Sequence, residues 1–301
     1  MKNKILFIIN PISGVQKKAK LPELIEQNLD LNKFEYTLKY TERSGHATFI
    51  AKDAVAEGYD IVVAVGGDGS INEVAESLID TDIVLGILPM GSGNGFATHL
   101  KLPLRNARKA ILALNECRIE KIDVGKTNYG SFISCAGIGL EAAVARTYRH
   151  HSLRGFFSYT WALHKEILAK YRSKNNRVKF YLDGVEREEN IYLFTAFNSK
   201  YFGYNQGFAT KASLQDGLFD VVFVKSVPTW KMPILILLGL IKKIYWLKEA
   251  EFHSVRKIEI VSEGKRIIQV DGDSLMTSQN FIMEIKEKAL NLFVPKALKK
   301  L

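Results

Sequence analysis

The sequence predicts an α/β domain, in which helices sandwich a parallel sheet, followed by a mainly antiparallel β domain. Apolar segments alternate with amphipathic helical patterns over the first third of the chain. Two of these segments, residues 61–65 and 83–88, are almost continuously apolar, which is typical of strands buried on both faces of a parallel sheet. From about residue 123 onward, residues alternate by twos around Asp183-Gly184, a strong signal for a two-residue hairpin.

The same patterns predict the strands and helices in chain order. In a first domain of residues 1–122 we expect strands at 4–10, 34–42, 61–65 and 83–88, and helices at 20–29, 45–58, 70–79 and 104–114. In a second domain of residues 123–285 we expect one helical block, hairpins and two further strands. The block covers about 140–172, the hairpins turn at Asp183-Gly184 and Glu263-Gly264, and the strands lie near 218–226 and 280–296.

Composition limits the classes of protein. The 301 residues carry a net charge of +10, which favours an anionic partner such as a nucleotide, nucleic acid or acidic membrane surface. Two cysteines without metal-site spacing predict a reducing, cytoplasmic compartment. The apolar run at 5–9 is shorter than a signal-peptide core, and the run at 232–241 is about half the length needed to span a bilayer.

Four strand-ending loops have unusual chemistry: "NPISG" (10–14, shortly before Lys17 and Lys18), Thr41 with Ser44-Gly45, "GGDGS" (66–70) and "PMGSGNG" (89–95). The carboxyl ends of parallel strands share one sheet edge, so these loops can converge on a single site. Glycines let backbone N–H groups approach phosphate oxygens, and helix N-termini favour negative charge. The loops therefore predict a phosphate site. Ser70 is alternatively an N-cap, with Glu73 completing a capping box.

These loops together resemble the motifs of the diacylglycerol kinase and sphingosine kinase family of lipid kinases. "GGDGSINEV" and "LPMGSGNGFA" are similar to its central motifs, and "KASLQDGLFDVVFV" (211–224) and "IIQVDGDS" (267–274) to its two later Asp-Gly motifs. The length is similar to that of the short bacterial members. The resemblance implies a first domain like that of NAD kinases and phosphofructokinases, a β-rich lipid-substrate domain, and a segment 286–301 that packs back on the first domain. It also implies an active site in the interdomain cleft.

The resemblance also implies roles for individual residues. Asp271 is implied as the general base, with Asp68 as its rival. Mg²⁺, as cofactor with the co-substrate ATP, is assigned to Asp68, Asp216, Asp123 and Asp273. Nucleotide binding is assigned to Asn10, Ser13, Gly14, Thr41, Gly66, Gly67, Asp68, Gly69, Ser70, Glu73, Gly91, Ser92 and Asn94. From the residues alone, Asp216-Gly217 and Asp271-Gly272 are turns like Asp183-Gly184.

Two positions depart from the family pattern. Gly95 stands where many diacylglycerol kinases have aspartate, and Asp273 stands where the family has glutamate. The first departure leaves the acceptor open between diacylglycerol, a related glycerolipid and a sphingoid lipid. The shorter carboxylate of Asp273 alters the reach toward metal or water.

Membrane contact is predicted independently of the family. Residues 229–248 combine an apolar block with tryptophans, a tyrosine and lysines, and residues 146–157 are basic and aromatic. Such a composition is typical of an interfacial helix, which predicts peripheral contact with an anionic membrane on the cytoplasmic face. A core helix covering the β domain is the alternative. The sequence leaves a homodimer open.

Other functional classes fit the sequence less well. An NAD kinase-like phosphotransferase shares "GGDG", but the Asn72-Glu73 extension and "NPISG" argue against it. A basic nucleic-acid-binding protein would explain the charge but not the Asp-Gly loops, and no such recognition motif is present. A non-catalytic nucleotide- or lipid-binding relative is disfavoured because Asp68 and Asp271 are both present.

Overall fold

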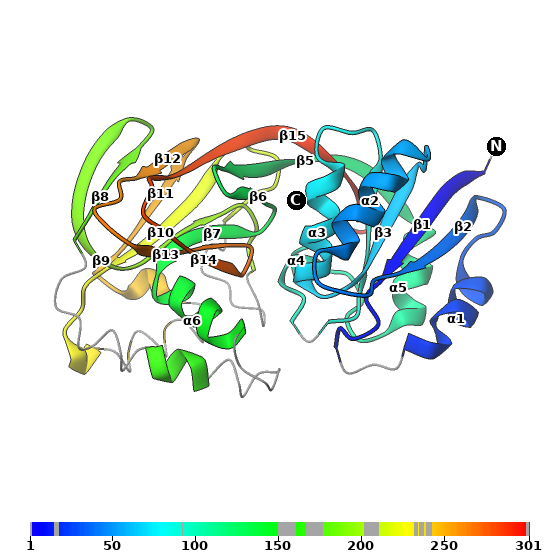
Figure 1. Cartoon of the computed structure of the whole chain (residues 1–301), viewed down its shortest axis with the longest axis horizontal. Coiled ribbons are helices and arrows are strands. Elements are labelled where there is room, and N and C mark those ends of the chain that lie inside the picture. Colours follow the sequence, from blue (N-terminus) through cyan, green and yellow to red (C-terminus); the bar gives the residue numbers. More distant parts are fainter. Residues whose placement is uncertain are drawn as a thin grey trace. The chain divides into compact units, whose positions relative to one another are not determined.

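The structure, a computed structural model, describes residues 2–14, 18–91, 93–149, 161–166, 177–201, 211–231, 234, 238, 243–298 and 301 (Figure 1). The chain divides into two compact units: residues 1–124 with 287–301, and residues 125–286. It passes from one unit to the other within β5 (Cys117–Thr127) and again within β15 (Phe281–Pro295). The first unit is a parallel α/β structure and the second is mainly antiparallel β, so the predicted fold class is confirmed.

The first unit is built on a parallel sheet in the order β15-β4-β3-β1-β2. Its other strands are β1 (Asn3–Ile9), β2 (Phe34–Tyr40), β3 (Ile61–Gly66) and β4 (Val84–Pro89). Strands β3 and β4 are buried along their whole length, as their continuous apolar sequences predict. The C-terminal strand joins this sheet, because Asn291 and Leu292 of β15 pair in parallel with Val84 and Leu85 of β4.

Helices flank the sheet (Figure 1): α1 (Leu21–Asn28), α2 (His46–Ala56), α3 (Asp68–Leu78), α4 (Gly95–His99) and α5 (Ala107–Leu114). Helix α1 packs on α5, and α2 packs on α3. One core cluster joins Ile25 of α1 and Ile111 of α5 to Phe7 and Val63 in the sheet. The short helix α4 was not predicted, and it follows a loop that the sequence analysis treated only as a ligand site.

The second unit contains strands β6 (Gly130–Phe132), β7 (Cys135–Gly139), β8 (Arg177–Leu182), β9 (Val185–Phe197), β10 (Phe219–Lys225), β11 (Ala250–Val255), β12 (Lys257–Ile260), β13 (Arg266–Val270) and β14 (Asp273–Thr277). Strand β9 is central, because its first half pairs with β8 and its second half pairs with β7 and β10. Phe194 of β9 packs against Phe180 of β8 and Phe223 of β10, with the three ring centroids 5.2–5.9 Å apart.

One predicted hairpin is confirmed and one is wrong. Leu182 pairs with Val185, so Asp183-Gly184 forms the two-residue turn between β8 and β9. The strands on either side of Glu263-Gly264 do not pair with each other: β12 pairs with β8 and β15, whereas β13 pairs with β7 and β14. Residues 261–265 form a connection between sheets rather than a tight turn, because both strands find partners elsewhere.

The helical part of the second unit is described in pieces. Helix α6 (Leu140–Arg149) begins where the helical block was predicted to begin, and residues 161–166 are also helical. The rest of the predicted block lies outside the described residues. Two short 3₁₀ helices, η2 (Thr229–Lys231) and η3 (Ile244–Trp246), lie in the segment predicted to be interfacial.

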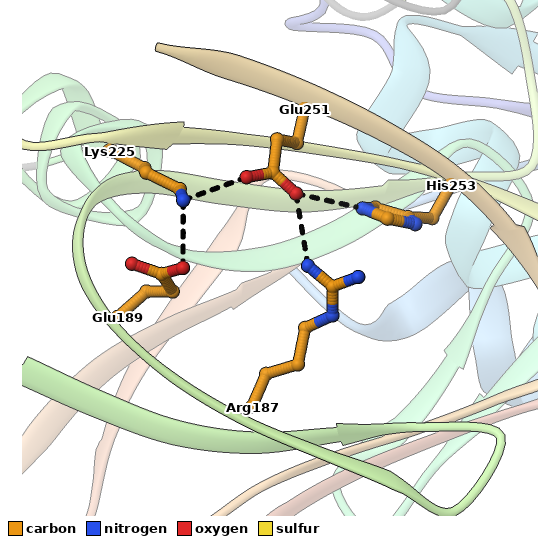
Figure 2. A network of polar contacts seen from close by, with 5 residues as sticks. All are labelled: Arg187, Glu189, Lys225, Glu251 and His253. Atoms are coloured by element: carbon orange, nitrogen blue, oxygen red, sulfur yellow. Dashed lines mark hydrogen bonds and ion pairs between the residues drawn. The ribbon is translucent and has the colours of Figure 1, made fainter.

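An ionic network ties together three strands of the second unit (Figure 2). Lys225 of β10 contacts Glu189 of β9 at 2.7 Å and Glu251 of β11 at 2.8 Å, and Glu251 also accepts from Arg187 at 3.0 Å. The His253 ring lies 3.2 Å from Glu251 and stacks on Phe223. The hydrogen bond from Lys225 lowers the pKa of Glu251. Partly exposed pairs of this kind contribute about 0–1 kcal/mol each, so the network mainly fixes strand pairing.

Candidate active site

Three of the four predicted loops meet at the carboxyl edge of the parallel sheet. The amide Nδ2 of Asn10 donates to Ser70 Oγ at 3.1 Å, which joins the loop after β1 to the start of α3. The backbone N–H groups of Met90 and Gly91 both donate to Gly66 O, at 2.8 and 2.9 Å, which joins the loop after β4 to the end of β3. The structure therefore brings residues 10–14, 66–70 and 89–91 into direct contact.

Close contact between these loops explains two of the glycines. A Cβ atom on Gly14, whose φ is +70°, would lie 2.0 Å from Met90 O, and one on Gly91 would lie 2.3 Å from Gly67 Cα. A Cβ atom on Gly69 would meet nothing within 4 Å. Gly14 and Gly91 thus let the loops pack backbone to backbone, while Gly69 leaves open space at the first turn of α3.

Asp68 joins the starts of two helices. It is the first residue of α3, and its carboxylate accepts from the backbone N–H groups of Gly95 at 3.0 Å and Phe96 at 3.3 Å, at the start of α4. Burial raises the pKa of Asp68 to about 6, and the two N–H donors oppose that rise. The carboxyl is therefore one that a nearby cation would strongly favour in its ionised form.

Asn94 presents an acceptor to the same region. The side chain is 7% exposed, and its Nδ2 donates to Gly91 O at 2.9 Å. Its Oδ1 is buried and has no hydrogen-bond partner among the described residues. A buried acceptor left in this state is costly, so the amide oxygen is suited to a donor or a cation supplied by a ligand.

Lys18 closes the first loop, a role that the sequence analysis did not assign. The side chain is buried, and its ammonium donates to the backbone carbonyls of Asn10 and Ser13 and to Ser13 Oγ. Burial lowers the pKa of Lys18 to about 8. A lysine shortly after "NPISG" was the available signal, but whether it faces a ligand or its own loop depends on the backbone path.

The alternative role of Ser70 as an N-cap, with Glu73 completing a capping box, is wrong. Helix α3 begins at Asp68, so Ser70 lies within its first turn. The Glu73 carboxylate instead accepts from the backbone N–H groups of Gly45 at 2.9 Å and Ala47 at 3.3 Å, at the start of α2. Thr41 is buried, and its backbone N–H donates to Ile9 O at 2.9 Å. Glu73, in α3, thus holds the remaining predicted loop, the one around Thr41 and Gly45, against that helix.

In the second unit, Asp271 and Gly272 form the turn between β13 and β14, since Val270 pairs with Asp273. Both turn residues have positive φ, +45° and +85°. The Asp271 carboxylate accepts three backbone N–H groups, from Ile133 at 2.7 Å and from Ser134 and Cys135 at 2.9 Å. The Asp271 N–H in turn donates to Cys135 O at 2.9 Å. Both carboxylate oxygens are therefore fixed in direction.

The remaining predicted metal residues are dispersed within their units. Asp123 is buried in β5 and accepts from Lys288 N at 2.8 Å. Asp216 is exposed and accepts from Leu218 N at 3.1 Å, and Asp273 begins β14 and is exposed. Among the described residues, no group of three or more His, Cys, Asp or Glu side chains is arranged to hold a metal ion. Ser92 lies outside the described residues.

The predicted interfacial segments are described only in part. Trp230, Tyr245 and Trp246 are 68%, 55% and 59% exposed. Lys231 lies over the Trp230 ring and Lys243 over the Trp246 ring, at 5.4 and 4.1 Å. Residues 150–157 and much of the apolar block after Lys231 lie outside the described residues. No helix in the described part of the chain has both the length and the apolar character required to cross a bilayer.

Comparison with known families defines the class of protein. Residues 4–127 match the diacylglycerol kinase catalytic domain, and residues 134–294 match the YegS C-terminal NAD kinase beta sandwich-like domain. The chain is therefore a kinase catalytic domain followed by a β-sandwich-like domain. This is the arrangement of the two units described above.

Relatives identify the family. The chain is 30% identical over 222 residues to a diacylglycerol kinase from Bacillus subtilis (strain 168), covering 72% of each protein. It is 29% identical to one from Staphylococcus aureus (strain bovine RF122 / ET3-1), covering 75% of this chain and 71% of the relative. The chain belongs to the diacylglycerol kinase family and is a lipid kinase.

Solved structures share the fold along nearly the whole chain. A diacylglycerol kinase structure from Bacillus anthracis str. Sterne superposes with a TM-score of 0.75 at 22% identity and covers 98% of both chains. A second structure from the same organism superposes with a TM-score of 0.78, with the same identity and coverage.

Proposed function

We propose that this lipid kinase transfers the γ-phosphoryl group of ATP to the hydroxyl of diacylglycerol, with Mg²⁺. The observation that carries the proposal is the buried Asn94 Oδ1, which lacks a partner among the described residues and lies beside the joined glycine loops. The curated relatives are named diacylglycerol kinases, which supports this acceptor over a related glycerolipid or a sphingoid lipid.

The first unit binds the nucleotide in this proposal. Gly69 leaves the first turn of α3 open, so N–H groups at this helix start can donate to phosphate oxygens. Lys18 holds the Asn10–Ser13 loop in one conformation, and Glu73 does the same for the loop around Gly45. The remaining assigned nucleotide residues are Ser13, Gly14, Thr41, Gly66, Gly67, Ser70, Gly91 and Ser92.

Mg²⁺ would be held mainly by phosphate oxygens and water, with few protein ligands. The donor set fits this arrangement, because Asp68 offers a carboxylate and Asn94 an amide oxygen, both of which Mg²⁺ accepts as ligands. Bound Mg²⁺ would neutralise charge that develops on the transferred phosphoryl group. In this proposal Asp216 is a second Mg²⁺ anchor, Asp123 a supporting residue and Asp273 a further metal residue.

Asp271 is the general base in this proposal. The three N–H groups of residues 133–135 orient its carboxylate, and a base must be held in this way to meet a substrate hydroxyl. Asp68 remains the rival for that role.

The lipid is reached at the cytoplasmic face of an anionic membrane in this proposal. The exposed Trp230, Tyr245 and Trp246, with Lys231 and Lys243 over two of the rings, have the composition of an interfacial contact. Replacing both tryptophans by serine should weaken binding to phosphatidylglycerol vesicles at least about threefold. The matched control is Phe252→Ser, a 44% exposed ring on β11. Equal binding by all three proteins would contradict the contact.

A homodimer remains a separate proposal, tested by sedimentation.

The test of function is transfer of labelled phosphate from ATP to lipids in mixed micelles. The acceptors are diacylglycerol, monoacylglycerol, phosphatidylglycerol and sphingoid bases, with NAD as a soluble control and Mg²⁺ present or chelated. We expect labelled phosphatidic acid, dependent on Mg²⁺. Label in a sphingoid base alone would move the assignment to that acceptor. Label in NADP, with none in any lipid, would overturn the proposal.

A further inference from the structure

Behind the Asp271 turn lies a buried polar row that crosses three strands. Gln269 of β13 pairs with Gly137 of β7, and Gly137 pairs with Thr195 of β9. Directly paired residues of antiparallel strands project from the same face of the sheet, so Gln269 and Thr195 flank a position that has no side chain. Both flanking side chains are 0% exposed. A Cβ atom on Gly137 would lie 2.2 Å from Phe194 O, so glycine at this position lets β7 and β9 pack closely between the two polar side chains.

Glu141, in the first turn of α6, joins the two polar side chains of the row. Its Oε1 accepts from Gln269 Nε2 at 3.0 Å and from Cys135 Sγ at 3.5 Å, and its Oε2 accepts from Thr195 Oγ1. Gly139, with φ of +98°, turns the chain from β7 into α6 immediately before it. The Glu141 carboxylate thus bridges β13 and β9, the two outer strands of the row, from helix α6, which follows the middle strand β7.

The Gln269 side chain links Glu141 to the Asp271-Gly272 turn. While its Nε2 donates to Glu141, its Oε1 accepts from Gly272 N at 2.9 Å. An amide offers one donor end and one acceptor end, and the ionised Glu141 carboxylate can receive only the donor end. The carboxylate therefore fixes which end of Gln269 faces the Asp271-Gly272 backbone.

We propose that Glu141 is a positioning residue for phosphoryl transfer, which acts through the Gln269 amide on the turn that holds Asp271. This inference rests on the proposed role of Asp271 as the general base. Residues 133–135 hold the Asp271 carboxylate from one side, and Gln269 holds the backbone of the turn from the other. Loss of either contact lets the carboxylate move, and a shift of about 1 Å can reduce a rate about 100-fold.

The second unit contains a matched control for Gln269. The Asn280 amide also bridges a glutamate and a backbone N–H: its Nδ2 donates to Glu259 Oε1 at 2.9 Å, and its Oδ1 accepts from Ser262 N at 3.0 Å. That bridge holds the connection between β12 and β13, to which no catalytic role is assigned. Removing it breaks bonds of the same two kinds, amide to carboxylate and backbone N–H to amide, without touching Asp271.

The experiment measures kcat and KM for Mg·ATP with dioleoylglycerol in mixed micelles. Gln269→Met should lower kcat at least about tenfold and leave KM for ATP within about twofold, because nucleotide binding is assigned to the first unit. Asn280→Leu should keep kcat within about twofold of wild type. Glu141→Leu should resemble Gln269→Met. Glu141→Gln should restore most of the rate, because its amide oxygen still accepts from Gln269 and Thr195 Oγ1 can accept from its NH₂.

A double-mutant cycle separates positioning from a general loss of structure. In an Asp271→Asn background, Gln269→Met should change kcat by less than about twofold, since the group that it positions is already altered. The same loss in both backgrounds, or a wild-type rate for Gln269→Met, would overturn the positioning role alone. An Asp271→Asn enzyme with wild-type kcat would overturn the base assignment and the positioning role together. If Glu141→Leu does not fold, the Glu141→Gln and Gln269→Met variants still test the positioning role.

Discussion

Two turns of the second unit share a sequence and a backbone conformation but differ in their surroundings. Asp183-Gly184 has φ values of +47° and +83°, and Asp271-Gly272 has +45° and +85°. In each turn the aspartate N–H donates to the carbonyl of the first residue of a neighbouring strand, Lys257 at 3.0 Å and Cys135 at 2.9 Å. Each aspartate carboxylate also accepts backbone N–H groups at the start of that strand.

The difference lies in what surrounds each carboxylate. Asp183 is exposed, and within the described part of the chain its carboxylate accepts through Oδ1, from the N–H groups of Arg256 and Lys257. Asp271 is half-buried and uses both oxygens, and Gln269 holds the glycine of its turn. Binding to a neighbouring strand is therefore a property of the Asp-Gly turn itself and does not mark a catalytic residue. The buried polar row behind the second turn is the feature that sets it apart.

The comparison is tested most strongly by replacing each aspartate with asparagine. Asp271→Asn should lower kcat for lipid phosphorylation by about 10²–10⁴-fold, which is the usual contribution of a general base, whereas Asp183→Asn should stay within about twofold. The measurement is labelled phosphate transfer at saturating ATP. Similar rates for the two variants would mean that the turns differ in surroundings but not in role.

Stability should separate the same two variants. At position 183 an asparagine keeps the Oδ1 that accepts both N–H groups, so the free energy of unfolding should change little. At position 271 the Ile133 N–H bonds to Oδ2 and would face an amide NH₂ instead. Leaving that donor without an acceptor should cost about 1–3 kcal/mol. Chemical denaturation monitored for the second unit provides the check, and a larger loss at position 183 would contradict this account.

A pH-dependent stability difference should distinguish the second turn from the first. Burial raises the pKa of Glu141 to about 7 from its usual 4.5, and the hydrogen bonds from Thr195 and Cys135 oppose the rise. The folded protein therefore binds this proton more tightly than the unfolded chain. The resulting stabilisation is complete below about pH 4.5 and is lost as pH rises through about 7. Wild type should thus lose up to about 3 kcal/mol relative to Glu141→Gln across this interval.

The measurement is the free energy of unfolding of both proteins at several pH values between 4.5 and 8. Asp183→Asn serves as the control, because the Asp183 turn has no Glu141 carboxyl behind it and its curve should run parallel to wild type. A wild-type curve parallel to that of Glu141→Gln would show that the carboxyl does not titrate in this interval.

Much of the fold could be predicted because single segments determine it. The continuous apolar runs of β3 and β4 and the alternation around Asp183-Gly184 are local signals, and all three elements formed. The hairpin at Glu263-Gly264 failed because alternation identifies strands but not their partners. The same limit applies to Glu73, whose sequence spacing fits a capping box while its carboxylate binds the start of α2.

The candidate site also contains some residues that the sequence could identify and others that it could not. The glycine loops and the Asp-Gly turn are contiguous motifs, and the sequence identified them. Lys18 and Glu141 carry no motif, because their contacts depend on how the loop closes and on which strands are neighbours. Gln269 meets Glu141 only because β13, β7 and β9 pair in one particular register. Pattern alone does not encode such pairing, so this row could not be predicted.

The smallest expected difference concerns the two glycines. A Cβ atom on Gly184 or on Gly272 would meet nothing within 4 Å, so only the positive φ opposes an alanine at either position. Gly184→Ala and Gly272→Ala should therefore destabilise the second unit by about 1–2 kcal/mol each, and by nearly the same amount. Thermal unfolding of the two variants measures this directly. A clearly larger loss at position 272 would mean that the bond from Gly272 N to Gln269 adds to the cost, which would make the turns unequal in backbone as well as in surroundings.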